Sequence, residues 1–191
     1  RAHRPRAFFI QTLLHNPSGS TTEPAICHRL LSLAETYGFA LIEDDVYGDL
    51  YEGPAVRLAQ IDGLRHVIYV ASFTKLIGPS LRLGFVAADS RVIAQLVERN
   101  MLSVLSGSAL IESMASEVLD SGRFMRHTQL VRARLARMRR DAQAALESAG
   151  ITFDTAADAG PGNGPGDGMF LWGRVPDTVD VDAVVRNARD K

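Results

Sequence analysis

The stretch ASFTKLIGPSLRLGF, which runs from Ala71 to Phe85, decides the fold that the sequence predicts. It holds Lys75, which with Lys191 is one of two lysines among 21 basic residues. Arginine can replace lysine on a solvated surface, but a guanidinium cannot act as an amine nucleophile. The lysine at this position therefore indicates a chemical role for its amine, with a plain surface lysine as the alternative.

The apolar runs around this stretch are predicted as strands of one sheet. They are AFFIQTLL (7–14), FALIE (39–43), VIYVAS (67–72) and LGFVAA (83–88). Apolar strands separated by helical patterns are typical of a mostly parallel sheet that is buried on both faces. The last two runs are close together in the sequence, which allows one of that pair to be antiparallel. We therefore expect an α/β fold with a three-layer, mostly parallel sheet and flanking helices.

A helix is predicted between the first two strands. Thr21 or Thr22 suits its N-terminal cap, and Pro24 suits its first turn. Gly38 provides a stop signal at its end. The apolar side chains expected on its buried face, at helical spacing, are Ile26, Leu30, Leu33 and Tyr37.

The sequence from residue 91 onward is predicted to be helical, in segments 91–105, 109–121 and 122–148. In the longest segment, apolar residues recur on one side and the arginines mostly take the other faces. A solvated basic face is the expected interpretation, with a nucleic-acid contact as the alternative. These arginines are Arg132, Arg134, Arg137, Arg139 and Arg140.

A smaller α+β unit is predicted after the long helix. The run GPGNGPGDG (160–168) is a loop, because so many glycines and prolines do not fit inside a regular element. MFLWGRV (169–175) is predicted as a strand, and DVDAVVRNAR (180–189) begins a helix. We expect residues 1–121 to be part of a large domain, and 122–191 to hold the connecting helix and part of a small C-terminal domain.

The composition is that of a soluble globular protein, with 46% hydrophobic and 23% charged residues. The formal net charge of −1 predicts no general affinity for nucleic acid or anionic membranes. No apolar run is long enough to span a bilayer, and Arg1 begins no secretory leader. The single cysteine, Cys27, fits a reducing compartment, so a cytoplasmic location is expected. Cys27 and His28 lack a zinc-ligand spacing, so no metal is expected.

Polar and ionisable side chains follow the predicted strands at the edge where open α/β sheets bind ligands. A lysine there can form a Schiff base with an aldehyde, and a hydroxyl with an arginine suits a phosphate. A carboxylate can keep a pyridinium nitrogen protonated, while amide and phenol groups can hydrogen-bond a ring oxygen. This combination describes a site for pyridoxal 5'-phosphate (PLP). The residues are Asn16, Asp44, Tyr47, Ser72, Lys75 and Arg82.

Each of these residues also has a plainer interpretation. The acidic run EDD (43–45) suits a magnesium site or a solvated turn. Asn16 followed by Pro17 is a turn signal when taken alone. Tyr47 could be a packing residue, and Arg82 could pair with any nearby carboxylate. The lysine motif is what favours the cofactor site over these alternatives.

Several motifs together resemble those of fold-type-I PLP enzymes, the class I/II aminotransferases. They are NPSG (16–19), EDDVYGDL (43–50), and SFTK (72–75) followed by Arg82. The longer runs EDDVYGDLYEG and SFTKLIGPSLRLGF are similar to the aminotransferase-like domain of MocR-type regulators in the GntR family. Those regulators fuse a DNA-binding winged helix-turn-helix to this fold. The resemblance covers about residues 7 to 172.

The resemblance implies a role for each site residue. Lys75 carries the cofactor as a Schiff base and later moves protons at the substrate α-carbon. Asp44 pairs with the pyridine nitrogen and makes the ring an electron sink. Tyr47 and Asn16 hydrogen-bond the ring hydroxyl. Lys75, Asp44 and Tyr47 are therefore the expected catalytic residues.

The phosphate of the cofactor is held, by the same resemblance, by Ser72 and Arg82. The peptide bond between Asn16 and Pro17 is often cis in this family. The family also uses an upstream segment that supplies phosphate-binding amides and a ring-stacking aromatic, and a downstream arginine for the substrate carboxylate. Neither is found in this sequence, so a partial chain is expected.

Two functions are compatible with these residues. The first is transfer of an amino group between an amino acid and a 2-oxo acid through PLP bound at Lys75. The second uses the same site in a GntR/MocR-type transcriptional regulator to sense an effector. A homodimer is expected in either case, because family members usually build their sites at a subunit interface. DNA is expected as a partner only if a winged helix-turn-helix precedes Arg1.

Overall fold

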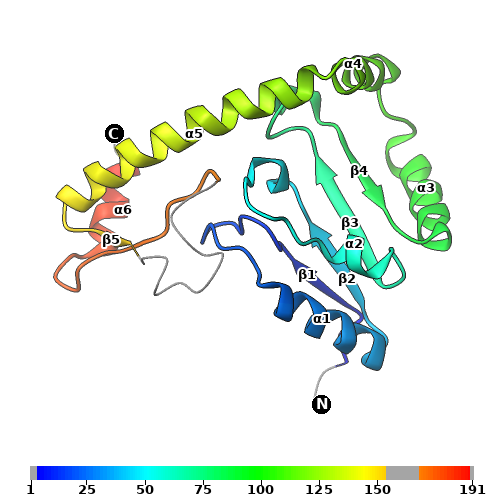
Figure 1. Ribbon diagram of the computed structural model, residues 1–191, viewed down its shortest axis with the longest axis horizontal. Helices are drawn as coiled ribbons and strands as arrows, with labels where there is room; N and C mark the ends of the chain where they lie inside the picture. The colour runs from blue at the N-terminus through cyan, green and yellow to red at the C-terminus, as the bar shows by residue number, and fades with distance from the viewer. Residues whose placement is uncertain (1–3, 154–167, 190–191) are drawn as a thin grey trace.

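A computed structural model describes residues 4–153 and 168–189 of the chain (Figure 1). Apart from Gly168, the predicted glycine-rich loop lies outside the described residues. Within the described part of the chain, no helix is long and apolar enough to cross a membrane.

A four-stranded sheet forms the centre of the first half of the chain, in the order β1-β2-β3-β4. The strands are β1 (Ala7–Ile10), β2 (Ala40–Asp44), β3 (Val67–Ser72) and β4 (Gly84–Ala87). β1, β2 and β3 are parallel, and β4 is antiparallel to β3. The predicted α/β class with a mostly parallel sheet and flanking helices is confirmed.

One face of the sheet is covered by α1 (Pro24–Tyr37) and the short α2 (Leu58–Asp62). Their shared core is small and tightly closed, since each of its members is at most 1% exposed. The members are Cys27, Ala34, Leu41, Leu58 and Val67. The chain thus uses small side chains of α1 to bring the helix close to the strands.

The predicted buried face of α1 is wrong for three of its four residues, since only Leu30 packs, partly buried, against this core. Ile26, Leu33 and Tyr37 are 46%, 38% and 68% exposed, and the helix buries Cys27 and Ala34 instead. The predicted threonine cap is also wrong, because Glu23 occupies the N-cap position without a side-chain hydrogen bond. Pro24 in the first turn and the left-handed Gly38 at the end are confirmed.

Three helices follow β4, namely α3 (Ser90–Val104), α4 (Ala109–Asp120) and α5 (Arg123–Ser148). The long α5 lies across the carboxyl ends of β2 and β3 (Figure 1). Its Phe124 is buried in a second core that includes residues from the loops after β1, β2 and β3. The buried members of this core are Leu14, Tyr47, Leu50, Leu76 and Phe124. The long helix therefore borders the edge of the sheet where the predicted site residues gather.

Two arginines of α5 have a structural role that the sequence did not indicate. Arg139 is 9% exposed and donates to the carbonyl oxygen of Phe170. Arg132 donates from Nε to the carbonyl oxygen of Asp49 at 2.8 Å. The expected solvated face is therefore wrong for Arg139, whereas Arg134, Arg137 and Arg140 are exposed.

A two-stranded antiparallel sheet pairs β5 (Thr152–Phe153), at the end of the first described segment, with β6 (Gly173–Arg174) in the second, and α6 (Val181–Arg189) follows. The predicted strand at 169–175 is thus limited to two residues, and the predicted helix at 180–189 is confirmed.

Asp62, at the end of α2, provides a pH-dependent contribution to stability. Its buried carboxylate accepts hydrogen bonds from the backbone amides of His66 and Val67 at 2.6 and 3.1 Å. Burial raises the pKa of Asp62, but the hydrogen bonds from His66 and Val67 outweigh it and hold the pKa below its usual value. A depressed pKa in the folded state stabilises the fold above the unfolded pKa, about 3.9, and this contribution is lost as the pH falls through the folded value.

We therefore expect Asp62→Asn to lower the free energy of unfolding at pH 7 by about 1–3 kcal/mol. The difference from the wild type should shrink as the pH is lowered below about 4. Urea unfolding at several pH values measures both effects, with the exposed Asp177→Asn as the matched control. A difference that stays constant down to pH 2 would contradict the assignment.

Candidate functional site

The three parallel strands end at one edge of the sheet, and their following loops carry the predicted site residues. β1 ends at Ile10, β2 at Asp44 and β3 at Ser72. Because ligands of open α/β sheets bind beyond the carboxyl ends of the strands, this edge is the candidate site. α5 borders it, as His127 Nε2 donates to the carbonyl oxygen of Leu76, next to Lys75, at 2.8 Å.

Glu43 is fully buried and has a structural role. One carboxylate oxygen accepts from the Thr12 hydroxyl at 2.7 Å and from the Leu58 amide at 2.8 Å. The other accepts from the Ala59 amide at 2.9 Å. Leu58 and Ala59 open α2, and their amides have no partner within that helix. Glu43 therefore caps a helix that begins 15 residues later in the chain.

Asp45 is also held by neighbours within the fold. Its Oδ2 lies 2.5 Å from Arg57 Nε and accepts from the Tyr69 hydroxyl at 2.6 Å. Burial, followed by the hydrogen bond to Asp45, raises the pKa of Tyr69 above its ordinary range. A Cβ at Gly48 would lie 2.0 Å from Asp45 Oδ1, so this turn requires glycine.

Asp44 lies between these two residues and, because strand side chains alternate, on the opposite face of β2. Its Oδ2 accepts from Gln11 Nε2 at 2.8 Å, and its Oδ1 accepts from the Val46 amide at 3.3 Å. Each oxygen of a carboxylate has two lone pairs, so both can accept a further hydrogen bond. The side chain is half-buried, which leaves it accessible to a ligand at this edge.

The acidic run 43–45 therefore separates into three environments. Glu43 and Asp45 are buried and hydrogen-bonded within the fold, whereas Asp44 lies on the side of the candidate site. Among residues 4–153 and 168–189, no group of three or more histidine, cysteine or acidic side chains is placed to hold a metal ion. The magnesium and solvated-turn alternatives thus have no geometric support at Glu43 and Asp45.

Tyr47 lies at the base of this edge and is 6% exposed. Its ring packs edge-on against Phe170, with the ring centroids 5.2 Å apart. Burial, with a smaller effect from the charge of Asp44, raises the pKa of Tyr47. The phenol therefore keeps its proton at neutral pH and can donate a hydrogen bond.

Lys75 is exposed in the loop after β3. A hydrogen-bonded turn precedes it, and a buried residue that anchors the loop follows it. In the turn, the Ser72 hydroxyl accepts from the Thr74 amide at 3.2 Å and donates to the carbonyl oxygen of Leu83 at 3.4 Å. The anchor is Leu76, which is 6% exposed in the second core. The backbone on both sides of Lys75 is thus fixed while its amine remains accessible.

Arg82 ends the short 3-10 helix η2 (Pro79–Leu81) in a left-handed conformation, with φ of 50°. A residue other than glycine in this region costs about 1–3 kcal/mol and is often found at functional sites. Neither Arg82 nor Lys75 makes a side-chain hydrogen bond or ion pair with the other described residues. The alternative in which Arg82 pairs with a nearby carboxylate is therefore not observed.

Asn16 is exposed in the turn after β1, and its peptide bond to Pro17 is cis, as the family resemblance implied. Its backbone N–H donates to Gln11 Oε1 at 2.8 Å. Gln11 thereby contacts both Asp44 and Asn16, and the sequence analysis missed it. The run 7–14 reads as one strand in sequence, whereas β1 ends at Ile10 and leaves Gln11 at the site edge.

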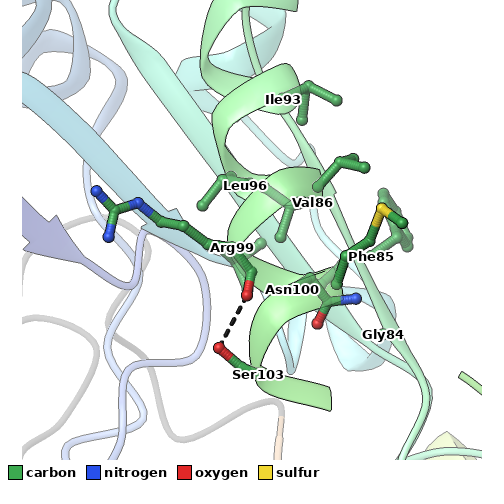
Figure 2. A pocket seen from close by; sticks show the side chains of 12 residues that line it. Gly84, Phe85, Val86, Ile93, Leu96, Arg99, Asn100 and Ser103 are labelled. Atoms are coloured by element: carbon green, nitrogen blue, oxygen red, sulfur yellow. Dashed lines mark hydrogen bonds between the residues drawn. The ribbon is translucent and has the colours of Figure 1, made fainter. Parts of the chain in front are cut away.

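An open groove lies away from this edge, between β4 and α3. Its volume is about 660 Å³, and Figure 2 shows Leu96 of α3 beside Val86 of β4. None of the six predicted site residues lines this groove. The candidate site is therefore the polar edge at the ends of the strands.

The fold and this edge define an α/β protein that presents an amine, a carboxylate and hydrogen-bonding groups at the carboxyl ends of a mainly parallel sheet. The chain belongs to the family of class I and II aminotransferases, whose model matches residues 1–182.

The sequence relatives of this chain include proteins named as transaminases and proteins named as transcriptional regulators. The (S)-3,5-dihydroxyphenylglycine transaminase of Amycolatopsis orientalis is 30% identical over 98% of this chain and 44% of that protein. The uncharacterized HTH-type transcriptional regulator YdfD of Bacillus subtilis is 28% identical over all of this chain and 39% of that protein. The family thus includes both enzymes and regulators among the relatives of this chain.

Solved structures agree with the fold. Pyrococcus horikoshii kynurenine aminotransferase, in complex with PMP, has a TM-score of 0.81 at 27% identity and covers 97% of this chain. The α-aminoadipate aminotransferase LysN of Thermus thermophilus, complexed with N-(5'-phosphopyridoxyl)-L-leucine, has a TM-score of 0.78 at 29% identity and covers 98%. This chain spans 45% and 48% of those two proteins, respectively.

Proposed function

We propose that this chain is the PLP-binding part of an enzyme that transfers an amino group between an amino acid and a 2-oxo acid. The observation that carries the proposal is the different environment of the adjacent carboxylates. Glu43 and Asp45 are bound by neighbours in the fold, whereas Asp44 stays accessible at the edge that bears Lys75. PLP chemistry needs an acid opposite the ring nitrogen and an amine for the aldehyde.

The donors at this edge fit PLP in chemical type. The Arg82 guanidinium suits its phosphate, because an arginine fork matches phosphate oxygens. The Ser72 hydroxyl would donate to the same phosphate in place of the carbonyl oxygen of Leu83, to which its hydrogen bond is long at 3.4 Å. The Asn16 amide and the protonated phenol of Tyr47 suit the oxygen on the ring. The exposed amine of Lys75 has no competing partner among the described residues.

The bound cofactor would supply an electron sink for negative charge at the substrate α-carbon. The residues of this chain would control that chemistry. Asp44 would keep the proton on the ring nitrogen, and Tyr47 would donate a hydrogen bond to the ring oxygen. Lys75 would hold the cofactor and then carry a proton to and from the α-carbon.

The decisive experiment uses the full-length protein. PLP is added, its visible absorbance is followed, and a panel of amino acids is then tested for formation of 2-oxo acids. Turnover supports the enzyme. A spectral change that saturates without 2-oxo acid formation supports the second candidate below, and no change with PLP overturns both.

The second candidate is an effector-sensing domain of a GntR/MocR-type transcriptional regulator that uses the same PLP site. The observation that favours it is the similarity to YdfD, whose name describes an HTH-type regulator and of which this chain covers 39%. In that case DNA would be a partner through a winged helix-turn-helix outside these 191 residues.

Further properties of the whole protein are proposed on the same basis. We propose a homodimer, a cytoplasmic location, and a division of this chain into 1–121 and 122–191. The division is supported by α5, which links the four-stranded sheet to the separate β5–β6 pair. Size-exclusion chromatography with light scattering would test the dimer.

The contrast between two neighbouring aspartates gives a specific prediction. We expect Asp44→Asn to reduce kcat/KM by about 10²-fold or more, because the ring nitrogen loses its charged partner. Asp45→Asn should instead lower the free energy of unfolding by about 1–3 kcal/mol, because it weakens the contact with Arg57. Kinetics and urea unfolding of both variants measure the contrast. Equal kinetic losses in the two variants would contradict the assignment of Asp44.

A further inference from the structure

Gln11 joins two residues of the candidate site through one side chain. It is the first residue after β1, and it lies on the same edge as the ends of β2 and β3. Its Nε2 donates to Asp44 Oδ2 at 2.8 Å, and its Oε1 accepts from the Asn16 amide at 2.8 Å. Both distances are those of well-formed hydrogen bonds.

The orientation of this amide follows from the chemistry of its partners. The nitrogen and oxygen of a glutamine amide look alike, so their positions must be assigned from the hydrogen bonds. The backbone amide of Asn16 can only donate, so Oε1 must face it. Nε2 then faces the carboxylate of Asp44, which accepts. The two bonds therefore support one orientation and exclude its flipped form.

The hydrogen-bond partners of Gln11 differ from those of Glu43 and Asp45 at the same edge. Glu43 and Asp45 bind a helix end and an arginine, which are parts of the fold. Gln11 is half-buried and binds the carboxylate of Asp44 and the backbone N–H of Asn16, the two residues whose side chains the proposed function places against the cofactor. Its bond to Asp44 is made to an acceptor that still has a free lone pair on each oxygen.

We propose that Gln11 is a positioning residue that fixes the carboxylate of Asp44 relative to the turn at Asn16. The inference rests on the proposed function, because Asp44 and Asn16 are its cofactor residues. One planar amide of fixed orientation links the carboxylate that meets the ring nitrogen to the backbone of Asn16, whose side chain meets the ring oxygen. Gln11 thereby prepares both contacts before PLP binds.

Two substitutions of Gln11 in the full-length protein test its hydrogen bonds to Asp44 and Asn16. Gln11→Glu keeps an acceptor for the Asn16 amide but replaces the donor to Asp44 with a second carboxylate. Gln11→Met keeps the length of the side chain and removes both bonds. Gln60→Glu, on the exposed side of α2, makes the same chemical change away from the site and serves as the matched control.

The measured quantities are the Kd for PLP, from a visible-absorbance titration, the melting temperature of the PLP-free protein, and kcat and KM. We expect Gln11→Glu to raise the Kd for PLP by about 10- to 100-fold, as expected for loss of a hydrogen bond to a charged group. Gln11→Met should raise the Kd for PLP less than Gln11→Glu does, because it places no second negative charge beside Asp44. The loss should appear in kcat with the KM for the amino donor nearly unchanged, and Gln60→Glu should match the wild type.

The outcomes distinguish this inference from the proposed function. If the wild type binds PLP through Lys75 and both Gln11 variants bind it equally well, the inference is overturned and the proposed function stands. If the variants bind poorly only because the PLP-free protein melts at a lower temperature, Gln11 is structural and the inference is again overturned. If the wild type gives no Lys75-dependent absorbance, the proposed function fails and the inference fails with it.

Discussion

Lys75→Ala is expected to abolish the visible absorbance of the lysine-bound cofactor and to lower the rate of amino transfer by about 10⁴-fold or more. In the proposed function the amine binds the aldehyde and carries the proton, and neither role can be taken over by an alanine side chain. The change should leave the fold intact, because Lys75 is exposed and surface substitutions usually alter stability by less than about 0.5 kcal/mol.

A second substitution at the same position separates charge from nucleophilicity. Lys75→Arg keeps the positive charge but removes the amine nucleophile, so it should fail as completely as Lys75→Ala. Arg91→Ala, at an exposed site on α3, is the control that should retain full absorbance. Near-normal activity of Lys75→Arg would mean that the residue acts only through its charge, which would exclude the proposed role.

The sequence predicts the sheet well because the strand signal is local. The four apolar runs lie within two residues of the observed strands, except that the first continues past Ile10. The short connection between the last two runs also allowed an antiparallel pair, which β3 and β4 form. Asp44 and Lys75 were predicted to lie at the carboxyl edge of the sheet, and the structure has Asp44 at the end of β2 and Lys75 in the loop after β3.

Features that depend on distant parts of the chain were not predicted. Of the four apolar residues predicted on the buried face of α1, only Leu30 packs against the core, because the small Cys27 and Ala34 form the face that meets the sheet. The buried Arg139 could not be distinguished from its exposed neighbours, because its partner is the carbonyl oxygen of Phe170, 31 residues away. Hydrogen bonds of this range leave no periodic signal in the sequence.

The role of Glu43 shows the same limit most clearly. In the sequence it is one of three adjacent acids, and nothing local separates it from Asp44 or Asp45. In the structure its carboxylate provides the partners that the first turn of α2 lacks. A five-residue helix cannot stabilise itself, so α2 depends on this distant carboxylate.

Glu43→Leu is therefore expected to lower the free energy of unfolding by about 3–5 kcal/mol, a large part of the stability of a typical domain. The substitution leaves the Thr12 hydroxyl and the amides of Leu58 and Ala59 buried without partners. Glu43→Gln should cost less, about 1–2 kcal/mol, because its carbonyl oxygen can still accept from Thr12 and Leu58 while only the bond from Ala59 is lost.

Urea unfolding of the full-length protein measures this order, with Glu35→Gln on the exposed surface of α1 as the control within about 0.5 kcal/mol of the wild type. Amide hydrogen exchange gives an independent measure, since the amides of Leu58 and Ala59 should lose protection first. If Glu43→Leu were as stable as the wild type, the carboxylate would not support α2. Glu43 would then have to be reconsidered, together with Asp44, as part of the candidate site.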